Sequence, residues 1–168
     1  MTAQVDPAPR ERLTARVLLL DPQGRILLMK GRLPSAPDGP GSWFTVGGGY
    51  EPGETLAQAA LREIREETGI DEAELGPVIG VREGVMRLAH GEAVLMKESY
   101  LVARCAACEP VRDGWDAVER DLIDDMRWWT HAELAATEDR VFPPGLADLL
   151  VEVLADRTPQ TPLALPWR

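Results

Sequence analysis

With 168 residues, the chain is long enough to form one domain with a hydrophobic core. Because 45% of its residues are hydrophobic, as in ordinary globular proteins, a folded protein is a better interpretation than a disordered one. Its net charge of −10 argues against a general basic surface for a long nucleic acid. No apolar run approaches the roughly 20 residues of a membrane span, and the first residues lack the order of a signal peptide. We therefore expect a cytoplasmic protein that does not bind membranes, and one that needs a cation to handle phosphates.

The N-terminal part of the chain predicts strands joined by short connections. Residues 1–12 are polar and contain prolines, which favours a flexible arm. Two apolar strands are expected over 12–21 and 25–32, separated by the turn sequence Pro-Gln-Gly. A loop rich in Pro, Gly and Ser follows over 33–42, and a short strand over 43–46 then runs into three glycines.

Helical periodicity begins after Glu54. Thr55 can cap the helix, with Gln58 three residues later as its capping-box partner. Gly69 stands where a left-handed glycine ends a helix, so the pattern predicts a helix of about 13 residues. The apolar stripe that would face a core consists of Leu56, Ala60, Leu61 and Ile64.

The C-terminal half predicts further strands and two helices. The expected strands are 76–88, 93–105 and 126–129, with a polar turn at 89–92. The expected helices are 130–137 and 143–157, the second with proline at its start. Neither a repeat nor a domain break is visible, so we expect a single α/β domain over 13–157 with a mixed sheet, followed by a proline-rich tail over 158–168.

Cys105 and Cys108 are too few for a disulfide framework. As half of a zinc site they would need further ligands, and His90 and His131 do not have metal-ligand spacing. We interpret the two cysteines as reduced residues at a strand end.

Three carboxylates lie on one side of the predicted helix. Glu63 has Glu66 and Glu67 as its neighbours three and four positions on, and like charges at this spacing repel. A solvated acidic face is the alternative, and Arg62 paired with Glu66 would suit it. The glycines at 47–49 favour a binding site instead, because backbone oxygens there can approach a ligand closely. Carboxylate and carbonyl oxygens are the ligands that Mg²⁺ prefers.

The stretch from Gly47 to Ile70 resembles the signature of the Nudix (MutT-like) hydrolase family. That signature is a glycine, five residues, a glutamate, seven residues, and then R-E-U-x-E-E-x-G-U, where U is apolar. Every fixed position is filled here: Gly48, Glu54, Arg62, Glu63, Ile64, Glu66, Glu67, Gly69 and Ile70. One departure is Val46, where many members have proline.

The resemblance implies an α/β/α sandwich around a mixed sheet. It also implies Mg²⁺- or Mn²⁺-dependent hydrolysis of a small-molecule nucleotide, a nucleoside diphosphate linked to another group X, by water attack. By the same resemblance the metal ligands would be Glu63, Glu66, Glu67 and the Gly47 carbonyl, with Glu63 also a candidate general base. Members of the family often form homodimers, and this chain is expected to be able to do so.

Residues around these ligands carry further expectations. Arg62 and Glu54 are expected to pair and to orient the ligand carboxylates. The resemblance also implies an additional acidic ligand or base outside the signature, for which Glu98 is the first choice and Glu119 the second. The alternative for Glu98 is an exposed charge on the polar side of a strand.

Substrate contacts are predicted from the scarce cations and the tryptophans. Lys30, Arg32 and Arg87 are candidates to bind phosphate, and Trp43, or else Trp115, to stack on a base. The alternatives are solvated cations and tryptophans that belong to the core. Specificity is expected to depend on the loops 31–42 and 107–124, so the identity of X and of the base stays open.

Two rival functions remain at this stage. One is a non-catalytic Nudix-fold nucleotide sensor, which a loss of signature glutamates would favour, and none is missing here. The other is an enzyme similar to isopentenyl-diphosphate isomerase, which would need a reactive cysteine in the pocket. The positions of Cys105 and Cys108, late in a predicted strand, do not favour that function.

Overall fold

The computed structural model describes residues 8–33, 36–88, 90–106 and 109–167. In these ranges the strands are β1 (Arg10–Leu20), β2 (Ile26–Gly31), β3 (Ser42–Thr45), β4 (Ala73–Arg87), β5 (Ala93–Cys105), β6 (Ile123–Trp129), β7 (Val141–Phe142) and β8 (Leu163–Ala164). The helices are α1 (Leu56–Thr68), α2 (Ala117–Leu122), α3 (His131–Ala136) and α4 (Leu146–Leu154). None of these helices is long and apolar enough to cross a membrane.

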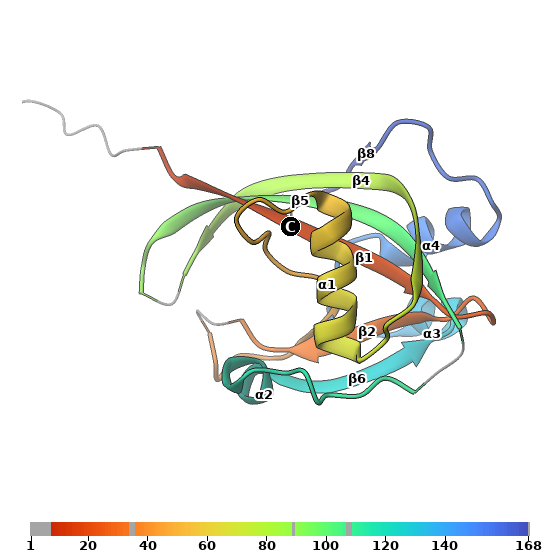
Figure 1. The fold of residues 1–168 in the computed structure, drawn as a ribbon, viewed down its shortest axis with the longest axis horizontal. Coiled ribbons are helices and arrows are strands. Elements are labelled where there is room, and N and C mark those ends of the chain that lie inside the picture. The colour runs from red at the N-terminus through yellow and green to blue at the C-terminus, as the bar shows by residue number, and fades with distance from the viewer. Residues whose placement is uncertain (1–7, 34–35, 89, 107–108, 168) are drawn as a thin grey trace, which may run out of the picture.

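The strands form one mixed sheet in the order β7-β3-β2-β1-β5-β4-β8, with β6 paired to the other side of β2. β1 runs parallel to β5 along its whole length, whereas it pairs with β2 only at the hairpin, Leu20 opposite Ile26. Beyond that point β1 and β2 diverge, as Figure 1 shows. The glycine segment after β3 fills the position beside β1, where the Ala15 N–H donates to the Gly48 carbonyl at 2.9 Å. The sheet therefore fixes the glycine loop directly.

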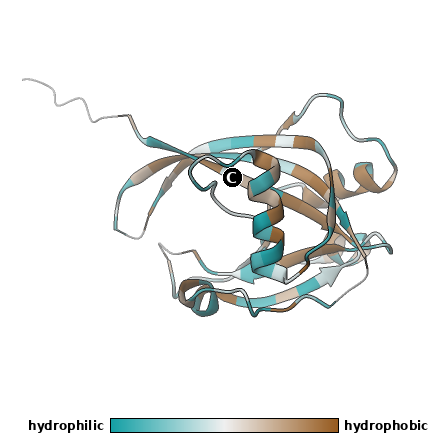
Figure 2. Cartoon of the chain, in the orientation of Figure 1, coloured by the Kyte–Doolittle hydropathy of each residue, from teal (hydrophilic) through white to brown (hydrophobic). Residues whose placement is uncertain are grey.

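Helices cover both faces of the sheet, as expected for an α/β fold with a mixed sheet. On one face, Ala59, Ala60 and Ile64 of α1 pack against alternate residues of β1. On the other face, α3 and α4 cover the intervening residues Leu18 and Leu20. The N-terminal end of β1 is exposed and hydrophilic, and the strand becomes hydrophobic further along (Figure 2). In the buried part of β1, alternate side chains thus face the two helical layers, as expected for a strand between them.

Local sequence signals explain why α1 begins and ends where it does. Thr55 accepts a hydrogen bond from the Gln58 N–H, and the Gln58 side chain accepts one from the Thr55 N–H, so the capping box is complete. Gly69 is left-handed at φ 71°, which a residue with a Cβ adopts with strain. Both ends agree with the prediction from sequence, and they fix where the glutamates of α1 lie.

β5 coincides with the predicted strand 93–105 and β3 is shifted by one residue, but several other elements differ from their predicted lengths. β4 begins at Ala73 and β6 at Ile123, each three residues before the predicted strand, and α4 is shorter than the predicted 143–157. α2 lies inside the predicted loop 107–124 and has no buried residue, so no apolar stripe marks it. β1 begins at Arg10, within the predicted arm 1–12, of which residues 1–7 lie outside the described ranges.

The single cysteine of the described residues, Cys105, ends β5 and is buried, and its Sγ lies 3.6 Å from the Leu20 carbonyl oxygen. The prediction for Cys108 concerns a residue outside the described ranges.

Candidate active site

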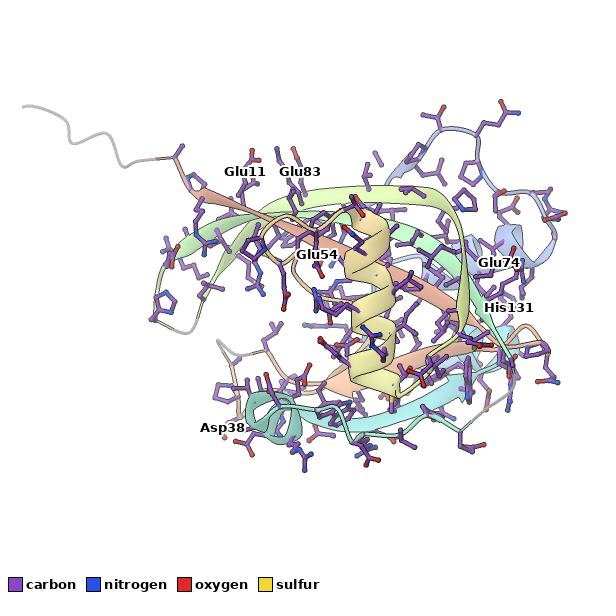
Figure 3. All side chains as sticks on the ribbon, in the orientation of Figure 1. Glu11, Asp38, Glu54, Glu74, Glu83 and His131 are labelled. Carbon is purple, nitrogen blue, oxygen red and sulfur yellow. The ribbon has the colours of Figure 1, made fainter. Side chains whose placement is uncertain are left out.

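Arg62 connects the loop before α1 to the glutamates on α1. Its guanidinium donates to both carboxylate oxygens of Glu54, at 2.7 and 2.9 Å, and to the Gly49 carbonyl at 2.9 Å. The remaining nitrogen, Nη1, donates to Glu63 Oε1 at 2.8 Å and to Glu66 Oε2 at 3.0 Å. Glu54 lies next to the first turns of α1 (Figure 3). One side chain thus sets the distance between the glycine loop and two of the three clustered glutamates.

The glycines of the loop are required by close contacts. A Cβ on Gly48 would lie 2.4 Å from Glu63 Oε1, so the carboxylate rests directly on the glycine backbone. Gly47 has φ 138°, and a Cβ there would lie 2.0 Å from the Ala15 carbonyl oxygen. Its N–H donates to Glu67 Oε2 at 2.8 Å. Gly48 therefore allows Glu63 to approach the loop backbone, whereas Gly47 allows the loop to lie against the backbone of β1.

The carboxylates of the site differ in their electrostatic surroundings. Burial raises the pKa of Glu63, although Arg62 opposes this, and burial together with the charge of Glu63 raises the pKa of Glu67 well above its usual value. The hydrogen bonds from Arg62 lower the pKa of Glu54 to about 2. The site therefore contains two buried carboxylates, Glu63 and Glu67, whose negative forms are costly without a further cation.

The donors at this site suit a hard divalent cation, because they are the carboxylates of Glu63, Glu66 and Glu67 and the Gly47 carbonyl. As the side chains stand, no three acidic, His or Cys groups of the described residues converge closely enough to hold an ion. Arg62 Nη1 lies between two of the carboxylates, but its bonds use one oxygen of each. Glu63 Oε2 and Glu66 Oε1 take no part in these bonds, so these two oxygens could, with Glu67, hold a cation.

Glu98 lies in a different setting from the one that its predicted role as a metal ligand requires. It is buried on β5, where Arg16 Nε donates to Oε1 at 3.0 Å and the Tyr100 hydroxyl donates to Oε2 at 2.9 Å. Arg82 Nε also donates to Oε2. Burial raises the pKa of Glu98, but the charges of Arg16 and Arg82 together lower it by more, so the net shift of the pKa is downward. Both oxygens of Glu98 are thus engaged by side chains of the sheet.

Glu119, the second choice for the additional acidic residue, lies on α2. Its charge is one of the causes that raise the pKa of Glu67, so the two carboxylates are close enough to interact. Its Oε2 accepts the Asp116 N–H at 2.8 Å in the capping box of α2. The predicted loop 107–124 therefore brings a carboxylate toward the glutamates of α1.

The predicted substrate-binding residues are divided between two places. Lys30 Nζ donates to Asp139 Oδ2 at 3.1 Å, and the Trp43 indole N–H donates to the same oxygen at 2.8 Å. The Trp43 ring is 3% exposed, so it is placed as a core residue rather than as a free stacking surface. Arg32 contacts Asp124 at 3.1 Å. These groups lie on β2, β3 and their neighbours.

Arg87 is at the far end of the β4–β5 hairpin, where it donates to the Gly91 carbonyl at 3.2 Å. Trp115, the other candidate for base stacking, is 5% exposed and donates to the Glu67 carbonyl at 2.6 Å. It therefore supports the C-terminal part of α1 instead of presenting a free ring.

Two surface pockets lie away from the clustered glutamates. One, of about 160 Å³, is bounded by Gly76, Arg104 and Asp156, and the other, of about 190 Å³, lies beside Asp139 and Pro143. The second is adjacent to the group formed by Lys30 and Trp43, since Asp139 belongs to both.

Sequence reasoning missed Arg16 and Arg82. Arg16 donates to Glu98 and, through Nη1, to the Gly47 carbonyl at 3.2 Å, so it contacts the glycine loop itself. A signal was present, since Arg16 is a lone charge inside the apolar run Ala-Arg-Val-Leu-Leu-Leu, where the other residues face the core. Its partner could not be read locally, because Glu98 is on a distant strand.

A profile of the NUDIX domain matches residues 10–150 of the chain. The chain is 63% identical over 102 residues to nucleoside triphosphatase NudI of Enterobacter sp. (strain 638), covering 56% of this chain and 66% of that protein. It is 41% identical over 76 residues to an RNA pyrophosphohydrolase of Caulobacter vibrioides (strain NA1000 / CB15N), covering 45% of this chain and 41% of that protein. The chain thus spans less than two thirds of the length of each of these relatives.

Solved structures show the same fold. The crystal structure of a MutT NUDIX hydrolase from Burkholderia pseudomallei superposes with a TM-score of 0.58 at 24% identity, covering 86% of this chain and 98% of that one.

Proposed function

Because the chain belongs to the NUDIX family, we propose that it is a metal-dependent hydrolase that cleaves the diphosphate bond of a nucleoside diphosphate linked to a further group X. The observation that carries the proposal is the single guanidinium of Arg62, which holds Glu54, Glu63, Glu66 and the Gly49 carbonyl together. A solvated acidic face would not need its glutamates seated against glycine backbone. This arrangement is what a site for a cation and a diphosphate requires.

The proposed metal ligands are Glu63, Glu66, Glu67 and the Gly47 carbonyl, with Mg²⁺ or Mn²⁺ as the ion. When bound, such an ion neutralises phosphate oxygens and makes a coordinated water more acidic. Glu63 is the proposed general base, because its burial against Gly48 raises its pKa, which makes the carboxylate a better proton acceptor. Arg62 and Glu54 orient these groups. Glu119, with its charge near Glu67, is the better candidate for an additional acidic ligand, since Glu98 is already engaged.

The proposed substrate class is the nucleoside triphosphates and related small nucleotides. A relative aligned over 102 residues is named as a nucleoside triphosphatase, which supports this class. Another is named as an RNA pyrophosphohydrolase, but the net charge of −10 disfavours a long RNA. Lys30 and Arg32 are proposed to bind phosphate, and Trp43 and Asp139 lie beside Lys30. The enzyme is further proposed to be cytoplasmic and able to form a homodimer.

The test is a phosphate-release screen of nucleoside triphosphates, nucleotide sugars and dinucleoside polyphosphates, with Mg²⁺ and Mn²⁺ in parallel. Glu66→Gln and Glu67→Gln are expected to lower kcat by orders of magnitude while circular dichroism stays unchanged. Glu72→Gln, which removes an exposed carboxylate just beyond α1, is the matched control and should keep wild-type activity. EDTA should abolish turnover, and added Mg²⁺ should restore it.

Wild-type turnover by both variants would refute the assignment of the ligands. Nucleotide binding without any turnover by the wild-type protein would instead favour a non-catalytic sensor.

A further inference from the structure

The segment 158–167, which we call the strap, lies along the edge of the sheet. Its strand β8 pairs in parallel with β4, and the Leu165 N–H donates to the Val81 carbonyl at 2.8 Å. Two glycines of β4 receive its side chains. A Cβ on Gly80 would lie 2.7 Å from Leu165 Cδ1, and a Cβ on Gly84 would lie 2.2 Å from the Trp167 ring. The strap and β4 are therefore complementary in shape.

Arg82 lies between these two glycines and under the strap. Its guanidinium is 4.8 Å from the centroid of the Trp167 ring and 5.5 Å from that of Phe142. The side chain is only 8% exposed, and within the described residues its Nη1 is buried without a hydrogen-bond partner. Such a buried donor is costly. The cation is held by its ion pair with Glu98 and by the aromatic rings of Trp167 and Phe142.

A continuous series of contacts runs from Arg82 to the glycine loop. Arg82 and Tyr100 both donate to Oε2 of Glu98, which leaves Oε1 for Arg16. Arg16 bonds Oε1 through Nε only, and its Nη1 donates to the Gly47 carbonyl at 3.2 Å. Because Arg82 and Tyr100 occupy Oε2, Arg16 bonds only Oε1 of Glu98, and its Nη1 is available for the Gly47 carbonyl.

We propose that the strap positions the Gly47 carbonyl, through Arg82, Glu98 and Arg16 as positioning residues. The structure has Arg16 in one arrangement, and the proposal adds a second one that depends on Arg82. While Arg82 occupies Oε2, Arg16 divides its guanidinium between Oε1 and the Gly47 carbonyl. If Arg82 becomes hydrated and leaves Oε2, Arg16 forms a bidentate pair with both oxygens of Glu98 and releases the carbonyl.

Trp167 controls which arrangement is populated, because its ring keeps water away from Arg82. A strap that merely stabilised the edge of the sheet would not affect the glycine loop. The consequence for catalysis rests on the proposed function, in which the Gly47 carbonyl is a metal ligand. The structural coupling itself does not.

Hydrogen exchange of the loop amides separates these possibilities. The Gly47 N–H is donated to Glu67 and the Tyr50 N–H to the Leu13 carbonyl, so both report on the loop. In the metal-free full-length protein, Trp167→Ala should speed exchange at residues 47–50 by about tenfold. Leu163→Ala, at a side chain of the strap that is 47% exposed, is the control and should leave that exchange unchanged.

A second variant keeps the inference testable if Trp167→Ala fails to fold. Arg16→Lys removes the fork that reaches Glu98 and Gly47 together, so it should speed exchange at 47–50 while the amides of 163–165 stay protected. Exchange at 47–50 that stays at the wild-type level in Arg16→Lys, or in a folded Trp167→Ala whose strap amides exchange freely, would overturn the proposal.

A kinetic measurement connects the strap to catalysis. The Mg²⁺ concentration for half-maximal activity should rise about tenfold in Trp167→Ala, with kcat at saturating Mg²⁺ near wild type. If the wild-type protein has no hydrolytic activity, the proposed function fails, and the exchange result still decides the coupling.

Discussion

At the scale of single residues, the site depends on side chains that contact several partners at once. Arg62 is the clearest case, because its planar fork reaches a loop carboxylate, two helix carboxylates and a backbone carbonyl. The hydrogen bonds to these groups raise its pKa above the usual value for arginine, so the charge is constant at any working pH. A residue with fewer donors could satisfy only some of these groups.

We predict that Arg62→Lys lowers kcat/KM by about 10- to 100-fold, because an ammonium cannot bond Glu54 bidentately and also reach Glu63. Steady-state kinetics on the substrate found in the screen would measure this. Arg65→Lys, a change on the same helix at an exposed position, is the control. An Arg62→Lys enzyme with wild-type kcat/KM would show that Arg62 does not orient the glutamates.

The two loop glycines should respond differently to alanine. Gly47→Ala combines φ 138° with a contact of 2.0 Å to the Ala15 backbone, so we expect it to lower the free energy of unfolding by more than about 1 kcal/mol. Gly48→Ala meets the end of the flexible Glu63 side chain, which can move. It should keep most of the stability and lose activity. Urea unfolding and kinetics of both variants would test this contrast, and equal losses of stability would contradict it.

Contacts between residues close in the sequence could be predicted, whereas contacts between distant strands could not. The sequence predicts the pair of Arg62 with Glu54, and the structure has the two side chains in bidentate contact, because both lie in one continuous motif. The pair of Arg16 with Glu98 was not predictable, since it depends on the register of two strands far apart in the chain. For the same reason the sequence does not reveal that Glu98, the first choice for an additional acidic ligand or base, is paired with Arg16 and Arg82.

At the scale of elements, α1 is the best-specified part of the chain. Its start and end were predicted, because capping is a local signal. The apolar stripe was predicted in part: Ala60 and Ile64 are buried, but Leu61 is 42% exposed, and the buried Ala59 was not expected. The short elements α2, β7 and β8 were not predicted. α2 has six residues and no buried side chain, and β8 exists through its pairing with β4. A two-residue strand such as β8 depends on its tertiary pairing rather than on its own sequence. The local signal of α2 is its capping box, formed by Asp116 and Glu119.

Removing the N-cap of α1 should cost stability in a predictable way. We expect Thr55→Ala to lower the free energy of unfolding by about 1 kcal/mol, because the Gln58 N–H loses its acceptor. Urea unfolding should show a lower midpoint with an unchanged slope. Thr161→Ala, at an exposed position in the strap, serves as the control. A midpoint equal to that of the wild type would mean that the cap does not stabilise this helix.

At the scale of the whole molecule, the net charge is negative, and individual carboxylates are stabilised by hydrogen-bond donors from distant parts of the chain. Asp139 illustrates this, since it accepts from Trp43 on β3 and from Lys30 on β2 and so ties the segment after α3 to the sheet. These contacts lower the pKa of Asp139, the hydrogen bond from Trp43 being the largest cause and that from Lys30 the next. The native state therefore favours the charged form.

The pH dependence of stability follows from the direction of this shift. The contribution of Asp139 is fully present above the ordinary aspartate pKa of about 3.9 and is lost as the pH falls through the lowered native pKa. We predict that Asp139→Asn is less stable than the wild type at pH 6, and that the difference in the free energy of unfolding shrinks below about pH 4. Urea titrations between pH 7 and pH 2.5 would measure it, with exposed Asp71→Asn as the control. A difference that is independent of pH would contradict the assignment.

The parallel pairing of β1 with β5 also affects how the chain is made. Every residue of β1, from Arg10 opposite Val94 to Leu20 opposite Arg104, has its partner in a segment that a ribosome completes much later. Until then β1 lacks its longest strand partner, and only segments made earlier, such as the glycine loop and α1, can cover its apolar run. Such high contact order slows folding and exposes the nascent chain to aggregation. The yield of folded protein from cells should therefore rise when chaperones are co-expressed or when the chain is synthesised at low temperature.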